Sequence, residues 1–166
     1  LAWRVAVNAD FEASWRDRWQ GAQRWQLGRE VKDFVVRRKD QLFAYQLAVV
    51  VDDQAQRITQ VVRGSDLLDS TPRQIWLQQL LGYAAPVYGH LPVLTNRAGQ
   101  KLSKQTHAPA LDNRRACNNL RLALGHLRQP PPATGEDDCR NLLAFATTHW
   151  QPAAVPALTR LAPGAD

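Results

Sequence analysis

The 166-residue sequence has no methionine, only two cysteines and no long apolar run. A helix that spans a bilayer needs roughly 20 apolar residues in succession, whereas the longest apolar stretch here, Leu47 to Val51, is only strand-sized. The first residues also lack the basic segment and apolar run of a signal peptide. We therefore expect a cytoplasmic protein with no membrane association. Because the chain starts without Met, inside a predicted strand, we interpret it as a fragment or a processed product.

The two cysteines, Cys117 and Cys139, form no C-x-x-C pair, and no histidine lies beside them at zinc-finger spacing. We expect two free thiols, as in a reducing compartment, with a disulfide as the alternative. The pattern predicts no metal site in this chain.

Positive charge exceeds negative charge, with 21 Lys and Arg against 15 Asp and Glu, a net charge of +6 and a pI near 9.9. Such a balance favours an anionic partner such as nucleic acid. With 45% hydrophobic residues the chain can also build a core, which argues against disorder.

Periodicity and turn residues predict short strands over residues 1–7, 33–38, 58–62 and 87–94. Pro92 is expected to limit pairing within the last of them. The apolar stretch 42–51 is expected to be buried. Its periodicity does not decide its secondary structure, and a strand that runs into a helix is one possibility. The strand 58–62 is also expected to be buried and to stop at Arg63 and Gly64. Open α/β sheets bind ligands at such strand ends.

Three helices are predicted. The first starts at Ser70 or Thr71, carries Pro72 in its first turn and ends at Gly82. Its expected apolar face consists of Ile75, Leu77, Leu80 and Leu81. The other two helices, over 111–127 and 136–150, are joined by a stiff proline-rich linker at 129–133.

Tryptophan and arginine alternate between Phe11 and Trp25, where three residues of each type occur: Trp15, Trp19, Trp25, Arg16, Arg18 and Arg24. One interpretation is a surface for RNA, because aromatic rings stack on bases and arginine binds phosphate. The other is a hairpin whose tryptophans close a small hydrophobic cluster. The sequence leaves both open.

The polar loop KLSKQ follows a predicted strand and turn, and it carries Lys101, Ser103 and Lys104. Two ammonium groups and a hydroxyl can hold a polyphosphate. The spacing alone is also common on protein surfaces.

Four segments in order resemble the class I aminoacyl-tRNA synthetases of the glutamyl and glutaminyl group: DFVVRRKDQLFAYQLAVVVDD (33–53), VVRGSDLLDSTPRQIWL (61–77), HLPVL (90–94) and KLSKQ (101–105). The KLSKQ loop is similar to the KMSKS signature of that family, which closes over ATP and stabilises departing pyrophosphate. The resemblance implies that Lys104 contacts ATP, with Lys101 and Ser103 in support.

The same resemblance implies roles for five further residues. Tyr45 matches a tyrosine that contacts glutamate, and Arg63 matches the arginine that pairs with the side-chain carboxylate of the substrate. His90 and Leu91 match the segment whose backbone holds adenine, although a structural histidine fits equally well. Asp66 is expected to help position either the adenosine or the loop at the strand end.

The resemblance covers about half of an active site, because the H-x-G-H motif of the family and its amine-binding residues are absent. We expect an α/β fold: the C-terminal half of a Rossmann-type class I catalytic domain followed by a small helical region. The expected parts are the end of an inserted acceptor-binding-like β segment (1–32), the catalytic half-domain (33–106) and the helical region (107–166).

The short remainder after Gln105 resembles the truncated branch of the family, which transfers glutamate to the queuosine base of tRNA(Asp). The implied substrates are glutamate, ATP and tRNA(Asp), with Mg²⁺ as cofactor and zinc only in the missing N-terminal half. We expect a monomer with that half. The alternatives are a fragment of an ordinary glutamyl-tRNA synthetase and a non-catalytic RNA-binding module.

Overall fold

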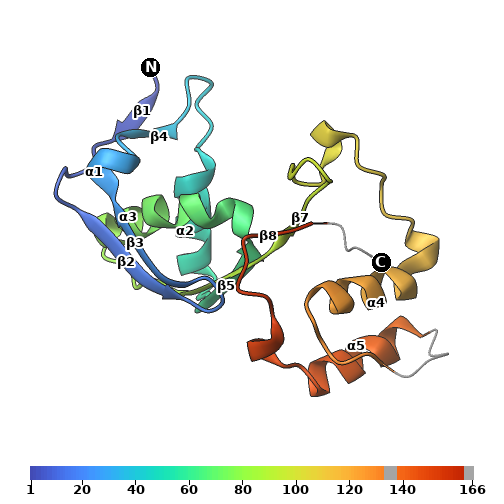
Figure 1. Ribbon diagram of the computed structural model, residues 1–166. Coiled ribbons are helices and arrows are strands. Elements are labelled where there is room, and N and C mark those ends of the chain that lie inside the picture. The colour runs from blue at the N-terminus through green and yellow to red at the C-terminus, as the bar shows by residue number, and fades with distance from the viewer. Residues whose placement is uncertain (133–137, 163–166) are drawn as a thin grey trace. The chain divides into compact units, whose positions relative to one another are not determined.

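The computed structural model describes residues 1–132 and 138–162, and it forms two compact units, Leu1–His90 and Leu91–Asp166 (Figure 1). Both contain helices and short strands, so the predicted α/β class is confirmed. The functional boundaries expected at 32/33 and 106/107 remain predictions, since the compact units divide at 90/91.

The first unit contains these elements: β1 (Trp3–Val5), β2 (Glu12–Asp17), β3 (Gly21–Gln26), α1 (Leu27–Glu30), β4 (Phe34–Arg37), α2 (Tyr45–Ala55), β5 (Gln60–Gly64), the 3-10 helix η1 (Ser65–Ser70), α3 (Thr71–Leu81) and β6 (Val87–Leu91). The strands pair two by two, β1 with β4, β2 with β3, and β5 with β6. Helices α2 and α3 lie against each other (Figure 1).

The β2–β3 hairpin confirms the second interpretation of the tryptophan-rich segment. Its strands pair in register from Glu12 opposite Gln26 to Asp17 opposite Gly21. Trp15 and Trp25 pack against a buried cluster of Ala13, Leu27 and Trp76. The Trp76 indole Nε1 donates to the Ala6 carbonyl at 2.9 Å, so helix α3 is fixed to the strand layer. The RNA-binding role of the exposed arginines remains a prediction.

Gly89 on β6 leaves room for the third tryptophan of this segment. A Cβ at position 89 would lie 2.6 Å from an atom of the Trp19 ring, closer than side chains pack. Glycine is therefore needed where the hairpin turn crosses β6.

Helix α3 begins and ends where the sequence predicted, with Gly82 in the left-handed conformation at φ 69°. Its expected apolar face is wrong in part, because Leu80 and Leu81 are about half exposed. The buried face instead includes Gln74 and Gln78. Both amides donate in the interior, Gln74 to Gln46 and Gln78 to the Tyr88 hydroxyl, while Gln78 Oε1 has no partner among the described residues.

Two further burial predictions are wrong. In the stretch 42–51 only Val50 is fully buried, and Phe43 is 63% exposed, although its helical part is confirmed as α2. On β5, Val62 is 52% exposed, whereas the predicted end of the strand at Arg63 and Gly64 is confirmed. Among the described residues, β5 pairs only with β6, in a two-stranded sheet.

The second unit contains β7 (Val93–Leu94), the 3-10 helices η2 (Lys104–Thr106) and η3 (Asn113–Arg115), α4 (Ala116–His126), α5 (Cys139–Thr148), η4 (Pro152–Ala154) and β8 (Arg160–Leu161). Pro92 separates β6 from β7, as expected, and β7 pairs with β8 in parallel. The two predicted helices are confirmed in shorter form. Residue 133 of the predicted linker and 136–137 of the last predicted helix lie outside the described residues.

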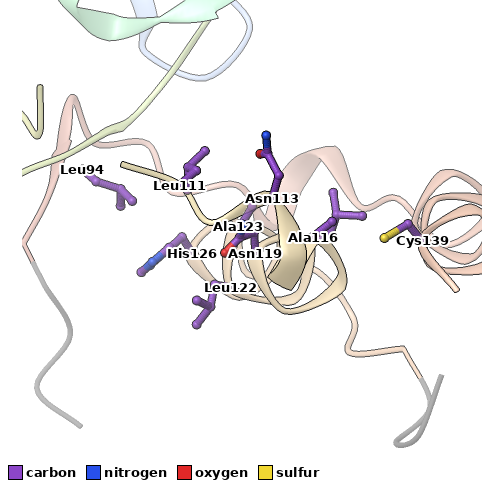
Figure 2. Close-up of a pocket in the computed structure, with 10 residues that line it drawn as sticks. Leu94, Leu111, Asn113, Ala116, Asn119, Leu122, Ala123, His126 and Cys139 are labelled. Atoms are coloured by element: carbon purple, nitrogen blue, oxygen red, sulfur yellow. The ribbon is translucent and has the colours of Figure 1, made fainter. Parts of the chain in front are cut away.

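A hollow of about 620 Å³ lies beside α4 and is mostly apolar. Figure 2 shows Leu122 and His126 projecting from α4 on the side where Leu94 and Leu111 lie. At the other end of this helix, the Cys117 and Cys139 sulfurs lie 2.7 Å apart as free thiols.

Gln129 connects the segments on either side of α5. Its side-chain amide donates to the Leu127 and Gln151 carbonyls and accepts from the Gln151 backbone N–H at 2.8 Å.

Within the described residues, no helix is both long and apolar enough to span a membrane.

Candidate functional site

Arg63 on β5 is held by two side chains from elsewhere in the first unit. Its Nε donates to His90 Nε2 at 3.0 Å, and its Nη2 donates to the Thr71 hydroxyl at 2.8 Å. The guanidinium also lies over the Tyr88 ring, 5.3 Å from the centroid. Two of the five N–H groups of arginine are used in these bonds, so three remain for a ligand. A planar, fixed guanidinium of this kind suits a carboxylate.

His90 in turn is held by Asp17 from the hairpin turn. The His90 Nδ1 and Asp17 Oδ2 atoms lie 2.5 Å apart, and neither side chain is exposed. Asp17 Oδ1 accepts from the backbone N–H groups of Trp19, Gln20 and His90, at 3.0 to 3.1 Å. This carboxylate is therefore fully satisfied despite its burial.

The hydrogen bonds to Asp17 decide its ionisation. Burial alone would raise the pKa of this carboxyl group. The bonds from the His90 side chain and from the backbone of Gln20, His90 and Trp19 outweigh burial and lower the pKa from 3.8 to about 2. Asp17 is thus a carboxylate at neutral pH, and it belongs to the same chain of contacts as Arg63.

Two more polar groups share the surroundings of Arg63. Tyr45 is the first residue of α2 and is half exposed. Like Arg63 and Asp53, it lies close enough to Tyr88 to influence the pKa of that phenol electrostatically. Burial raises the pKa of Asp53, while the positive charge of Arg63 acts to lower it. A half-exposed hydroxyl, a cation with free N–H groups and a carboxylate together suit a small ligand that bears both signs of charge.

The KLSKQ loop in the second unit has a defined shape. The Thr106 hydroxyl accepts from the Ser103 N–H at 2.9 Å and donates to the Lys101 carbonyl at 2.9 Å. Thr95 and Lys101 form an antiparallel bridge at the base of the loop. The side chains of Lys101 and Lys104 are both exposed. Because the loop backbone is fixed and both lysines are exposed, the loop can present positive charge to a phosphate.

The predicted ATP-binding residues have different surroundings. The His90 side chain is wholly buried, and its carbonyl accepts from the Gln20 amide at 2.9 Å. Leu91 ends β6, and Asp66 is exposed in η1. Contacts of these residues with adenosine remain predictions.

Sequence reasoning missed Asp17, Thr71 and Asp53. Asp17 comes 73 positions before its histidine partner, and no local pattern connects the two. Thr71 was considered only as the residue that begins a helix. Asp53 was read as part of the end of an apolar stretch, although α2 continues to Ala55.

Metal ligands are sparse. Residues 1–132 and 138–162 contain no group of three His, Cys, Asp or Glu side chains that could hold a metal ion.

Comparison with known proteins adds the family context. Residues 3–126 match the family described as tRNA synthetases class I (E and Q), catalytic domain. Similar curated proteins are the glutamyl-Q tRNA(Asp) synthetases of Thiobacillus denitrificans (54% identical over 93% of this chain) and Chromobacterium violaceum (51% identical over 94% of this chain). The chain spans about half the length of these relatives, 52% of each.

Two solved structures have a similar fold. A glutamate-tRNA synthetase from Elizabethkingia anophelis aligns over 95% of this chain and 36% of its own, with TM-score 0.70 and 20% identity. A glutamate tRNA ligase from Elizabethkingia meningosepticum, in complex with its amino acid, aligns over 61% of this chain and 20% of its own, with TM-score 0.55 and 28% identity.

Proposed function

Since this chain belongs to the class I tRNA synthetases of the glutamyl and glutaminyl type, we propose that it supplies the C-terminal half of a glutamate-activating active site. The enzyme activates glutamate with ATP and transfers the glutamyl group to the queuosine base of tRNA(Asp). The curated relatives named for this activity, at 51–54% identity, support this choice within the family.

The observation that carries the proposal is the fixed guanidinium of Arg63. Its three remaining N–H groups can bind the side-chain carboxylate of glutamate, and the nearby Tyr45 hydroxyl can contact the same substrate. Glutamine would place a neutral amide against this cation and leave it poorly paired. The site therefore selects glutamate.

The reaction has two steps. The α-carboxylate of glutamate attacks the α-phosphorus of ATP, and the bond between the α-phosphorus and the bridging oxygen breaks to release pyrophosphate. A nucleophilic oxygen of the acceptor nucleoside then attacks the glutamyl carbonyl, and AMP leaves. Lys104, supported by Lys101 and Ser103, offsets the charge that builds on pyrophosphate. No residue of this chain need act as a covalent nucleophile.

The magnesium ion of this chemistry would be carried by the triphosphate. Mg²⁺ prefers phosphate oxygens and water, and the described part of the chain has no three-residue group for a metal ion. We also place the enzyme in the cytoplasm, as a monomer, where free thiols persist.

The test is glutamate-dependent ATP–pyrophosphate exchange by the full-length protein without tRNA, followed by glutamyl transfer to tRNA(Asp) with and without queuosine. Exchange without tRNA and transfer only to the queuosine-containing tRNA are expected. Exchange that requires tRNA would indicate an ordinary glutamyl-tRNA synthetase. No exchange under either condition would indicate an RNA-binding module, which the basic composition would suit.

A further inference from the structure

We propose that Asp17 and His90 are positioning residues for glutamate: the buried carboxylate fixes the proton of His90 on Nδ1, so that Nε2 accepts from Arg63 and holds the guanidinium in its substrate-binding orientation. This inference rests on the proposed function, because it assigns the glutamate carboxylate to Arg63.

The donor and acceptor pattern fixes the form of the histidine. Arg63 Nε is always a donor, so His90 Nε2, at 3.0 Å, must present its lone pair. The ring proton then lies on Nδ1 and is donated to Asp17 Oδ2. The Thr71 hydroxyl, 3.2 Å from His90 Nε2, accepts from Arg63 Nη2 and can donate to the same nitrogen. The Arg63 Nε–H and the Thr71 hydroxyl therefore share the one lone pair of His90 Nε2, while the only ring N–H of His90 points at Asp17.

Burial makes this arrangement rigid. The Asp17 and His90 side chains are 0% exposed, so water cannot replace a lost partner. Arg63 is only partly buried, and its remaining N–H groups stay available. The side chains of the buried pair therefore act on substrate binding through Arg63 and touch no substrate themselves.

The substitution Asp17→Asn distinguishes positioning from mere support. The Asn Oδ1 atom can still accept the three backbone N–H bonds of the hairpin turn. Its amide NH₂ then faces His90 Nδ1, which must become an acceptor, and the ring proton moves to Nε2. A donor there faces the Arg63 Nε–H, and the bond that orients the guanidinium is lost.

Thr71→Val provides a second variant at a residue outside the buried pair. It removes the hydroxyl that accepts from Arg63 Nη2 while it keeps the shape of the side chain. Ser70→Ala is the matched control, because Ser70 is also buried at the start of α3 but bonds to Gln46 and not to Arg63.

The experiment measures glutamate-dependent ATP–pyrophosphate exchange by the full-length protein, together with the thermal midpoint of each variant. For Asp17→Asn and Thr71→Val we expect the KM for glutamate to rise about tenfold, with the KM for ATP unchanged, because one bond to a charged group is lost. Ser70→Ala should leave both constants unchanged. His90→Gln, whose carbonyl can accept from Arg63, should bind glutamate better than His90→Leu.

The outcomes separate the two proposals. A wild-type protein without exchange would overturn the proposed function. An active wild type whose KM for glutamate is unchanged in Asp17→Asn and Thr71→Val would overturn the positioning role. So would equal loss of activity toward both substrates with a lowered thermal midpoint, since that pattern indicates structural support only.

Discussion

Removal of the Arg63 side chain should have the largest effect on the binding of glutamate. In Arg63→Ala the carboxylate loses its charged partner, so we expect the KM for glutamate to rise by about 10–100-fold with a much smaller change for ATP. Exchange kinetics over a range of each substrate measure this difference. Arg73→Ala is the control, because it removes a positive charge whose hydrogen bond, in the part of the chain that the structure describes, goes to the Asp69 carbonyl. A change confined to ATP would contradict the assignment.

Lys104 should matter for chemistry more than for binding glutamate. Lys104→Ala removes a charge expected to stabilise departing pyrophosphate, and we predict that adenylate formation slows by about 100-fold. Single-turnover measurements would report it. Arg97→Ala, on the exposed turn that precedes the loop, removes the same charge and should have little effect. An unchanged rate in Lys104→Ala would argue against a phosphate role for the loop.

Asp17 should make the free energy of unfolding depend on pH in the acidic range. Its pKa is lowered from 3.8 to about 2 in the folded protein, so folding favours the ionised form. This contribution is fully present above pH 3.8 and is lost as the pH falls toward 2; it amounts to about 2 kcal/mol. Urea unfolding of the wild type and Asp17→Asn over this range tests it. The wild type should lose the larger share of its stability on acidification, and parallel losses would refute the prediction.

Local signals predicted elements well and burial poorly. Helix α3 was predicted at both ends because Pro72 and Gly82 act on the residues beside them. The exposure of Phe43 and Val62 was not predicted, because burial depends on which other segments cover a face. The buried glutamines of α3 were missed for the same reason: their partners Gln46 and Tyr88 are distant in the sequence or lie beyond the helix.

The two cysteines at the N-terminal ends of α4 and α5 should respond to oxidation. The Cys117 and Cys139 sulfurs are 2.7 Å apart, and both cysteines lie in the first turn of their helices. With oxidised glutathione as oxidant, the two thiols should lose two protons and two electrons and form an intramolecular disulfide. Mass spectrometry should show the loss of two hydrogens, reversed by dithiothreitol. The Cys117→Ser variant is the control, and covalent dimers or two persistent thiols would contradict the prediction.

At the scale of the whole molecule, the family and part of the site followed from the sequence. The order of four motifs indicated the class I glutamyl and glutaminyl group, and the match over residues 3–126 confirms it. Arg63 was identified by resemblance, whereas the partners that hold it were not. Asp17 lies far from Arg63 in the sequence, and only the fold brings them into one chain of hydrogen bonds.

The net charge of +6 predicts how the protein should respond to salt. If tRNA is the partner, counterion release should lower its affinity at least about tenfold between roughly 50 and 200 mM salt. Fluorescence anisotropy with labelled tRNA(Asp) measures this slope. A neutral polymer of similar size serves as the control. Affinity independent of salt would speak against a phosphate-binding surface.

The hydrogen bonds of Gln129 determine how much stability the protein should lose when residues are inserted near α5. Its amide pairs with both the N–H and the carbonyl of Gln151, as a neighbouring β-strand would, so one side chain closes the loop that contains α5. The entropy of closing a loop grows only with the logarithm of its length. Residues inserted between Pro132 and Asp138 should therefore cost little stability, whereas Gln129→Ala would open the loop at its base.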